Sequence, residues 1–289
     1  MKLEGNVIFI TGGGSGIGRA LAEALHMRGN KVIISGRRKG HLAKTIEANP
    51  GMDSIELDVA DPESIRRATE ELVARYPRLN VLINNAGIML IDDAATNVDD
   101  ELITSTITTN LMGPIRLTGA LIEHLKKQEF AAVLIVSSVL GFTPMAMTAV
   151  YSSTKAALHS YAQSLRFKLR HTPVRVLEVI PPWVRTELLN SSEEPRAMPL
   201  EEFITGTMEA LAADSDEILV PRAKFLRDQA GPNEALFFHP STSNSKYPSF
   251  RPWGHLVTHA TAPQYPKGDF DERFIAKSSR CTRWTQTME

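Results

Sequence analysis

Short apolar runs alternate with longer amphipathic stretches over the first 220 residues of the chain. Six of these runs are rich in aliphatic and β-branched residues, and they predict strands at 6–11, 31–35, 54–57, 81–83, 131–136 and 174–180. Between them the apolar positions recur at helical spacing, as at Ile17, Leu21 and Leu25. Strands that alternate with helices form parallel sheets with helices on both faces. The pattern therefore predicts an α/β domain of this kind, and the run 218–220 predicts a seventh strand.

Several helices carry end or bend signals in the sequence. The segment 61–63 (Asp-Pro-Glu) predicts a helix start, because an acidic side chain caps free N–H groups and proline suits the first turn. The periodic stretch 100–127 predicts one helix that bends at Pro114, just after Asn110. A further helix is expected over 151–170.

The last part of the chain departs from this alternation. Residues 187–215 begin with a polar stretch and continue at helical spacing, which fits a mobile lid over a substrate site. From about residue 239 the sequence contains five prolines and scattered aromatic residues, with no sustained periodicity. We therefore expect one folded domain, 1–238, followed by an irregular, disordered tail, 239–289, in which a short helix near 270–277 can form.

Charge and hydropathy describe an ordinary globular protein. Of the 289 residues 43% are hydrophobic, and the formal net charge of −1 gives no support for binding nucleic acid or an anionic membrane surface. The uncharged segment 130–154 is long enough to cross a membrane, but its serines, threonines, glycine and proline make it too polar and too broken for a bilayer helix. The start of the chain has no signal-peptide pattern. We expect a cytoplasmic protein.

Cysteine and histidine usage argues against a metal site. The single cysteine, Cys281, excludes an internal disulfide and a cysteine-rich metal centre, and it fits a reducing compartment. His255 and His259 are four residues apart, but no third ligand candidate lies near them in the sequence. We expect that the protein binds no metal.

A glycine-rich turn follows the first strand. Residues 11–18 (TGGGSGIG) join that strand to the start of a helix, an arrangement that presents free backbone N–H groups to a phosphate. The spacing is T-G-x-x-x-G-x-G rather than G-x-G-x-x-G, because Ile17 stands in the place of the last glycine. The alternative is a glycine-rich loop without a ligand.

The end of the second strand bears on which nicotinamide dinucleotide such a fold would bind. An acidic residue at this position would bind both ribose hydroxyls of NAD. This chain has Arg37 and Arg38 instead, and a guanidinium is the better match for the 2′-phosphate of NADP. The alternative is that both arginines are the solvated start of the next helix. The sequence favours NADP over NAD.

Polar and small residues also follow the third and fourth strands, at Asp58 with Val59 and at 84–87 (NNAG). The carboxyl ends of parallel strands border the crevice where such sheets bind ligands. The alternative role for these amides is a turn that ties strand to helix. Asn110, inside an apolar helix, needs hydrogen-bond partners, and it could equally be a satisfied core or interface residue.

Tyr151 and Lys155 are a candidate acid–base pair. Four residues apart on a helix, their side chains lie one turn apart on one face. A cation favours the phenolate, and lowering the tyrosine pKa from ~10 to neutrality requires about 4 kcal/mol. Ser138, at the end of the fifth strand, could donate to a carbonyl oxygen as charge develops on it, whereas the adjacent Ser137 should face the other way. A solvated helix pair is the alternative for the tyrosine and lysine.

Together these residues resemble the short-chain dehydrogenase/reductase family over about 1–220. The resemblance rests on the order and spacing of TGGGSGIG at 11–18, Asp58, NNAG at 84–87, Asn110, Ser138, Tyr151 and Lys155. The stretches 33–38, 110–125 and 156–165 are similar to the branch related to the oxidoreductase of the D-alanylation operon. The family implies a Rossmann-like, doubly wound sheet and hydride transfer between a nicotinamide and a carbonyl or secondary alcohol.

The resemblance also implies a role for each candidate residue. Tyr151 would exchange a proton with the substrate oxygen, Lys155 would lower its pKa and hold the nicotinamide ribose, and Ser138 would polarise the carbonyl. Asn110 would hold a water that links Lys155 to solvent. The residues implied to bind the cofactor are Thr11, Gly12, Ser15, Gly16, Ile17, Gly18, Arg37, Arg38, Asp58, Val59, Asn84, Asn85, Ala86, Gly87, Tyr151, Lys155, Pro181, Val184 and Thr186.

The segment after the sixth strand departs from the family pattern. Pro182 stands where the family usually carries glycine, which would reshape the nicotinamide side of the pocket. Trp183 would then overhang the substrate, or else pack on the surface.

We expect an NADP-dependent oxidoreductase with a small carbonyl or alcohol substrate whose identity the sequence leaves open. One alternative is a non-catalytic sensor or scaffold that binds NADPH, although a pure binder has no need of Tyr151 or Ser138. Another is a fold that the irregular tail disables. The resemblance implies a homodimer or homotetramer formed through the helices at 100–127 and 151–170.

Overall fold

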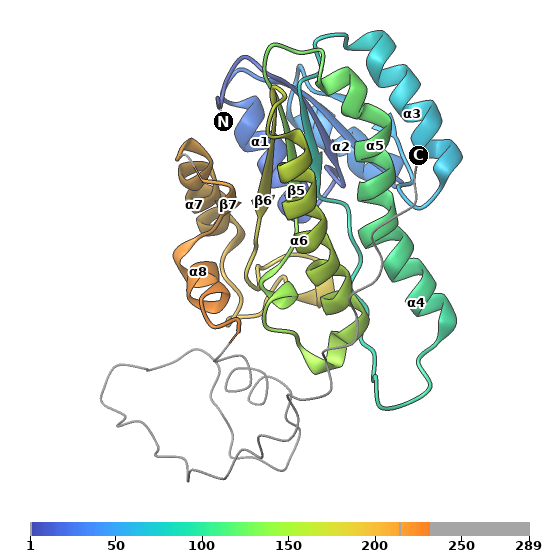
Figure 1. The fold of residues 1–289 in the computed structure, drawn as a ribbon, viewed down its shortest axis with the longest axis vertical. Coiled ribbons are helices and arrows are strands. Elements are labelled where there is room, and N and C mark those ends of the chain that lie inside the picture. Colours follow the sequence, from blue (N-terminus) through green and yellow to red (C-terminus); the bar gives the residue numbers. More distant parts are fainter. Residues whose placement is uncertain (1, 214, 232–289) are drawn as a thin grey trace, which may run out of the picture. The chain divides into compact units, whose positions relative to one another are not determined.

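The structure, a computed structural model, describes residues 2–213 and 215–231. Seven parallel strands form one sheet in the order β3-β2-β1-β4-β5-β6-β7 (Figure 1). The strands are β1 (Val7–Thr11), β2 (Lys31–Gly36), β3 (Asp53–Glu56), β4 (Val81–Asn84), β5 (Ala131–Val136), β6 (Val174–Val179) and β7 (Glu217–Ile218). The expected doubly wound parallel sheet is confirmed, and the strand ends differ from the sequence prediction by at most two residues.

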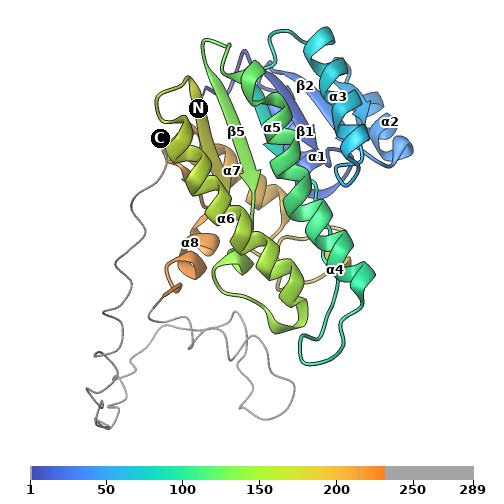
Figure 2. The ribbon, with the colours of Figure 1, turned by 45° about the vertical axis from the view of Figure 1, so that its right-hand side comes forward.

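Helices cover both faces of the sheet. One face is covered by α1 (Gly16–His26), α2 (Lys39–Ala48), α7 (Leu200–Ala212) and α8 (Pro221–Arg227). The other is covered by α3 (Pro62–Arg75), α5 (Gly113–Leu125) and α6 (Ala149–Leu169), with α4 (Asp100–Ile107) leading into α5. Figure 2 shows α5 and α6 crossing their face of the sheet next to each other.

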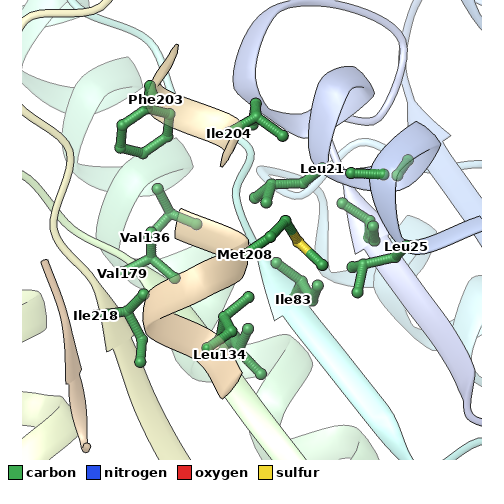
Figure 3. Close-up of a cluster of buried hydrophobic side chains, with 14 of the residues drawn as sticks. Leu21, Leu25, Ile83, Leu134, Val136, Val179, Phe203, Ile204, Met208 and Ile218 are labelled. Carbon is green, nitrogen blue, oxygen red and sulfur yellow. The ribbon is translucent and has the colours of Figure 1, made fainter. Parts of the chain in front are cut away.

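The two faces bury separate hydrophobic cores, because successive strand residues point to opposite sides. Ile8 and Ile10 of β1 belong to the core under α1 and α7, whereas Phe9 belongs to the core under α3, α5 and α6. Figure 3 shows the first core, where Met208 of α7 lies between Leu21 of α1 and the sheet. Burying each such side chain contributes about 1.5–3 kcal/mol, so both helix layers are held firmly to the strands that carry the site.

The single helix predicted over 100–127 is instead three segments. A π-helical turn, η1 (Thr108–Met112), separates α4 from α5. The bend was expected after Asn110 at Pro114, but the irregular turn contains Asn110 itself. Proline has no N–H, so Pro114 cannot donate the ordinary helical bond to the Asn110 carbonyl, and the helix widens there.

Some sequence predictions fall outside the described residues: the disordered tail from 239, the short helix near 270–277, and the histidine pair at 255 and 259. Residues 188–190 form a short helical turn, η4 (Leu188–Asn190), ahead of α7. Across the described residues, no helix is long and apolar enough to cross a membrane.

Candidate active site

The candidate site residues lie at the carboxyl-terminal edge of the sheet. Because all seven strands are parallel, the turns after β1, β4 and β5 leave the sheet on the same side. The glycine turn follows β1, the NNAG segment follows β4, and Ser138 follows β5. Residues far apart in the sequence are thereby brought together.

The glycine turn has no room for side chains. A Cβ at Gly12, where φ is +70°, would lie 2.9 Å from Asn85 Nδ2, and a Cβ at Gly18 would lie 2.3 Å from both that atom and the Gly12 carbonyl oxygen. Ser15 precedes α1 but its side chain does not cap the helix, and the first turn contains no acidic residue. In α3, by contrast, Asp61 accepts bonds from two first-turn N–H groups. The start of α1 is therefore suited to an anionic group.

Thr11 and Asn85 tie the ends of β1 and β4 to each other. The Thr11 Oγ1 accepts bonds from the backbone N–H groups of Asn85 and Ala86, both at 3.0 Å, and Asn85 Nδ2 donates to the Thr11 carbonyl at 2.9 Å. These bonds fix the shape of the crevice between the two strands. The alternative considered for these residues, a structural tie, is thus part of their role.

Not every residue expected at the cofactor has its side chain at this turn. Asn84 points to the α5 side, where its Nδ2 donates to Thr118 Oγ1 at 3.0 Å. Asp58 closes a local turn, since its Oδ1 accepts from the Ala60 N–H at 2.9 Å. Val59 is buried beside Gly113, where a Cβ would approach the Val59 carbonyl oxygen to 2.7 Å.

Arg37 and Arg38 are both exposed at the end of β2. Arg38 Nη2 donates to Ser15 Oγ at 3.0 Å, which places its guanidinium directly beside the glycine turn. The same nitrogen lies 3.5 Å from a carboxylate oxygen of Glu187 in the segment before α7. Arg38 is therefore a fixed positive charge at the site, and Glu187 competes for it.

Tyr151 lies in the first turn of α6 and is 7% exposed, as is Ser138. The Ser138 side chain acts on the Tyr151 hydroxyl as a hydrogen-bond partner that favours the phenolate. Burial raises the pKa of Tyr151 to about 12, and the bond with Ser138 offsets only part of this effect. At neutral pH the phenol is a protonated, buried donor.

The lowered tyrosine pKa expected from Lys155 is therefore not found. Lys155 Nζ donates to the Val136 carbonyl at 2.9 Å and lies 5.4 Å from the centre of the Tyr151 ring. Lys155 is itself only 4% exposed, and burial lowers its pKa to about 8. The ammonium remains charged at neutral pH, but it donates to a strand carbonyl, and burial is the largest influence on the pKa of the tyrosine.

Asn110 is fully buried in the π-helical turn, and its amide bonds to the segment after β4. Its Oδ1 accepts from the Ile88 N–H and its Nδ2 donates to the Ile88 carbonyl, both at 2.8 Å. A Cβ on Gly87 would lie 3.3 Å from Asn110 Oδ1 and 3.8 Å from Lys155 Nζ, so these groups are close neighbours. The side-chain amide of Asn110 is therefore satisfied within the protein, as the structural alternative for this residue expects.

The segment after β6 closes over this edge. The Pro181 carbonyl accepts from the Val139 N–H at 3.0 Å, Val184 is buried, and Thr186 lies next to Gly16. Trp183 is 38% exposed and its Nε1 donates to Ser191 Oγ at 2.8 Å. The tryptophan therefore anchors the segment that leads into α7.

Sequence reasoning missed Asp92, Glu178 and His159. The Asp92 carboxylate accepts from the N–H groups of Ala149 and Val150, both at 3.0 Å, and so caps the helix that carries Tyr151. Glu178 is fully buried, and it contacts Ser137 and the half-buried His159. A carboxylate on the apolar face of β6, which also carries Val174 and Val176, was a signal for Glu178, whereas nothing local indicates Asp92.

The sequence is similar to a known enzyme family and to individual proteins. The sequence profile of the short chain dehydrogenase family matches residues 6–197. The oxidoreductase DltE of Bacillus subtilis is 38% identical over 234 residues, which cover 79% of this chain and 93% of that protein. The 3-oxoacyl-[acyl-carrier-protein] reductase FabG of Salmonella typhimurium is 31% identical over 72% of this chain and 86% of its own length.

A solved structure shares the fold. A short chain dehydrogenase from Burkholderia cenocepacia, in complex with NADP, superposes with a TM-score of 0.74 and 26% identity, covering 84% of this chain and all of that one. The chain belongs to the short-chain dehydrogenase/reductase family and is an NAD(P)-dependent oxidoreductase.

Proposed function

We propose that this enzyme reduces a small carbonyl compound to an alcohol with NADPH, using Tyr151 as the proton donor. The observation that carries the proposal is that the buried Tyr151 phenol interacts with the buried Ser138, with Lys155 one turn along the same helix. A non-catalytic binding protein would have no use for a buried phenol paired to a serine beside the crevice.

The residues around the glycine turn fit a dinucleotide. The cradle at Gly12 and Gly18 admits only a backbone-to-phosphate approach, and the uncapped start of α1 favours a negative charge. Membership of the family supports NAD(P) as the dinucleotide that would bind here. When bound, the reduced nicotinamide supplies a hydride to the carbonyl carbon.

The side chains then divide the remaining work. Ser138 donates a hydrogen bond to the substrate oxygen, which accumulates negative charge as the carbonyl is reduced. Tyr151 gives its proton to the same oxygen and becomes a phenolate. Because the pKa of the buried phenol is about 12, that phenolate needs the nearby Lys155 ammonium, and its proton is then restored from solvent. The phenol is protonated at neutral pH, which is the form that carbonyl reduction requires of a proton donor.

NADP rather than NAD is supported by Arg38. Its guanidinium lies beside Ser15, and no carboxylate follows β2 to bind ribose hydroxyls. A guanidinium bonded to a phosphate contributes roughly 1.5–3 kcal/mol. Arg38→Ala should therefore weaken NADPH binding by roughly 10- to 150-fold and leave NADH binding within about twofold, measured by fluorescence titration.

The proton-transfer role is tested with Tyr151→Phe. The wild-type protein is first screened with NADPH and NADH against a panel of aldehydes, ketones and sugars. In Tyr151→Phe turnover of the best substrate should fall at least a thousandfold while the NADPH Kd stays within about threefold. Tyr161→Phe is the matched control, since Tyr161 is also a partly buried tyrosine of α6. Retained turnover in Tyr151→Phe would remove Tyr151 from the reaction.

A further inference from the structure

Glu178 is a fully buried carboxylate on the face of the sheet that α6 covers. It lies in β6 at 0% exposure, two residues beyond Val176, whose side chain belongs to the core under α6. Burying a carboxylate is costly unless hydrogen bonds and opposite charges compensate for the lost water. Its partners therefore identify what it does.

Both oxygens of Glu178 are bonded to residues of the active-site elements. Ser137 Oγ donates to Oε1 at 2.5 Å, and His159 Nδ1 lies 2.8 Å from Oε2. The other ring nitrogen of His159 lies 2.9 Å from Nε2 of Gln163, which is exposed on α6. The chain of contacts therefore runs from the end of β5, through the carboxylate, to the surface of α6.

A metal ion would use the same carboxylates in a different way. Ligand atoms of His159, Glu178 and Glu217 lie within 4.8 Å of one another. However, Arg227 Nε and Nη2 each donate to one oxygen of Glu217 at 3.1 Å. Because Glu217 is held by a guanidinium, this cluster is better satisfied as a network of hydrogen bonds and ion pairs than as a cation site.

The network reaches the candidate catalytic residues over a very short path. Ser137 directly precedes Ser138, and it follows Val136, whose carbonyl accepts the bond from Lys155 Nζ. Lys155 and His159 are one turn apart on α6. Three consecutive residues at the end of β5 thus have three different partners. Val136 binds Lys155, Ser137 binds Glu178, and Ser138 interacts with Tyr151.

We propose that Glu178 is a positioning residue of this active site: it fixes the strand end 136–138 through Ser137, and its charge balances the buried ammonium of Lys155. The inference rests on the proposed function and deepens it. Ser138 then meets the substrate oxygen in a fixed place, and Lys155 stays charged where it must stabilise a phenolate.

Electrostatics agree with the geometry. Burial lowers the pKa of Lys155, and the charge of Glu178 raises it in opposition. Among the described residues, His159 of α6 and Glu217 of β7 also bring titratable groups close to Glu178, and Glu217 is already paired with Arg227 of α8. Removing the charge at 178 should therefore make Lys155 lose its proton at a lower pH.

The test compares two variants that separate charge from shape. Glu178→Gln keeps the size and can keep a bond to Ser137, but it removes the charge. We expect kcat for carbonyl reduction to fall about tenfold, the NADPH Kd to change less than threefold, and the alkaline limb of the pH profile to move down by roughly half a unit or more. Ser137→Ala removes the strand-end bond and keeps the charge, so it should lower kcat without moving that limb.

Glu217→Gln is the matched control, because it removes a neighbouring carboxylate that does not bond to the strand end. It should leave both kcat and the alkaline limb within error of the wild type. A Glu178→Gln profile with an unmoved limb, or the same shift in Glu217→Gln, overturns the proposal. If Glu178→Gln does not fold, Ser137→Ala and His159→Gln are compared instead, and unchanged kcat in both overturns it.

A readout without turnover keeps this test distinct from that of the proposed function. The ε-carbon resonance of Lys155, assigned with Lys155→Met, reports its titration by NMR in the cofactor-free protein. A lower midpoint in Glu178→Gln supports the counter-charge role even if no carbonyl compound is reduced, and an unchanged midpoint overturns it.

Discussion

Replacing Asp92 should loosen the start of the helix that carries the candidate proton donor. Asp92 is 7% exposed and belongs to the segment between β4 and α4, far from α6 in the sequence. Its two carboxylate oxygens accept from the N–H groups of Ala149 and Val150, and its own N–H donates to the Met147 carbonyl at 3.0 Å. Thr148, at the N-cap position, makes no side-chain capping bond. The cap of α6 is therefore supplied from a distant loop.

The size of the effect follows from these bonds. A helix cap contributes about 0.5–2 kcal/mol, and a negative charge at a partly buried helix start contributes up to ~2 kcal/mol more. Asp92→Ala leaves two N–H groups without their acceptor, so it should lower the free energy of unfolding by roughly 2–4 kcal/mol. Asp92→Asn retains one acceptor and loses the charge, so it should cost about 1 kcal/mol. For a domain of this size the alanine variant should lower Tm by roughly 5–15 °C.

Calorimetry and NADPH-dependent turnover together test this reasoning. Because Tyr151 lies one turn into α6, Asp92→Ala should also lower kcat about tenfold at a temperature where the variant is folded. Asp93→Ala is the control: the Asp93 carboxylate accepts only the local bond from the Ala95 N–H and is exposed, so the expected change is below about 0.5 kcal/mol. Equal losses for Asp92→Ala and Asp93→Ala would refute the capping argument, and a destabilised variant with wild-type kcat would refute the link to Tyr151.

Three further predictions concern the crevice and its charges. In Gly18→Ala the new Cβ would lie 2.3 Å from Asn85 Nδ2, so the turn must shift. Calorimetry should show a Tm lower by at least about 5 °C. Retained stability and retained NADPH affinity would contradict the conclusion that the glycine turn is too tight for a side chain at this position. Glu187→Gln frees Arg38 from a competing carboxylate and should tighten NADPH binding about two- to fivefold without changing NADH binding; weaker NADPH binding would contradict this competition. The pKa of Lys155 is about 8 in the fold but higher in the unfolded chain, so between pH 8 and 10 the unfolded state binds the extra proton and stability should rise by roughly 2–3 kcal/mol. Denaturant titrations of Lys155→Met should lack that rise, and an equal rise in both proteins would assign it to other groups.

The sequence was sufficient for features that depend on neighbours along the chain. The strand runs and the glycine turn were predictable because hydrophobic period and backbone freedom are local properties. The widened helix turn at Asn110 was not, because the amide bonds to Ile88, a residue outside the helix, and that partner is set by the tertiary fold. The sequence predicted a lowered pKa for Tyr151, whereas burial raises it in the folded protein. Spacing along a helix says nothing about how deeply the phenol is buried.

The position of Glu178 on a buried face could be predicted from the strand pattern, but its partner could not. Val174 and Val176 share one face of β6, and the same period places Glu178 on that apolar face. A carboxylate there requires a partner, although the sequence does not say which one. His159, the partner found, lies on a helix that precedes the strand, and only the packing of α6 brings the two side chains to 2.8 Å.

The spacing along α6 and the ends of β5 and β6 together explain how the site is assembled. Tyr151, Lys155 and His159 follow one another at intervals of one helical turn, so one stripe of α6 presents a phenol, an ammonium and an imidazole to the sheet. Each of these groups contacts a different group of the sheet or its strand ends: the phenol contacts the Ser138 hydroxyl, the ammonium the Val136 carbonyl, and the imidazole the Glu178 carboxylate. A shift of α6 along its axis would break all three contacts at once. The cap from Asp92 and the contact between His159 and Glu178 both hold α6 against that shift, which is why Asp92 and Glu178 are expected to affect turnover without contacting the substrate.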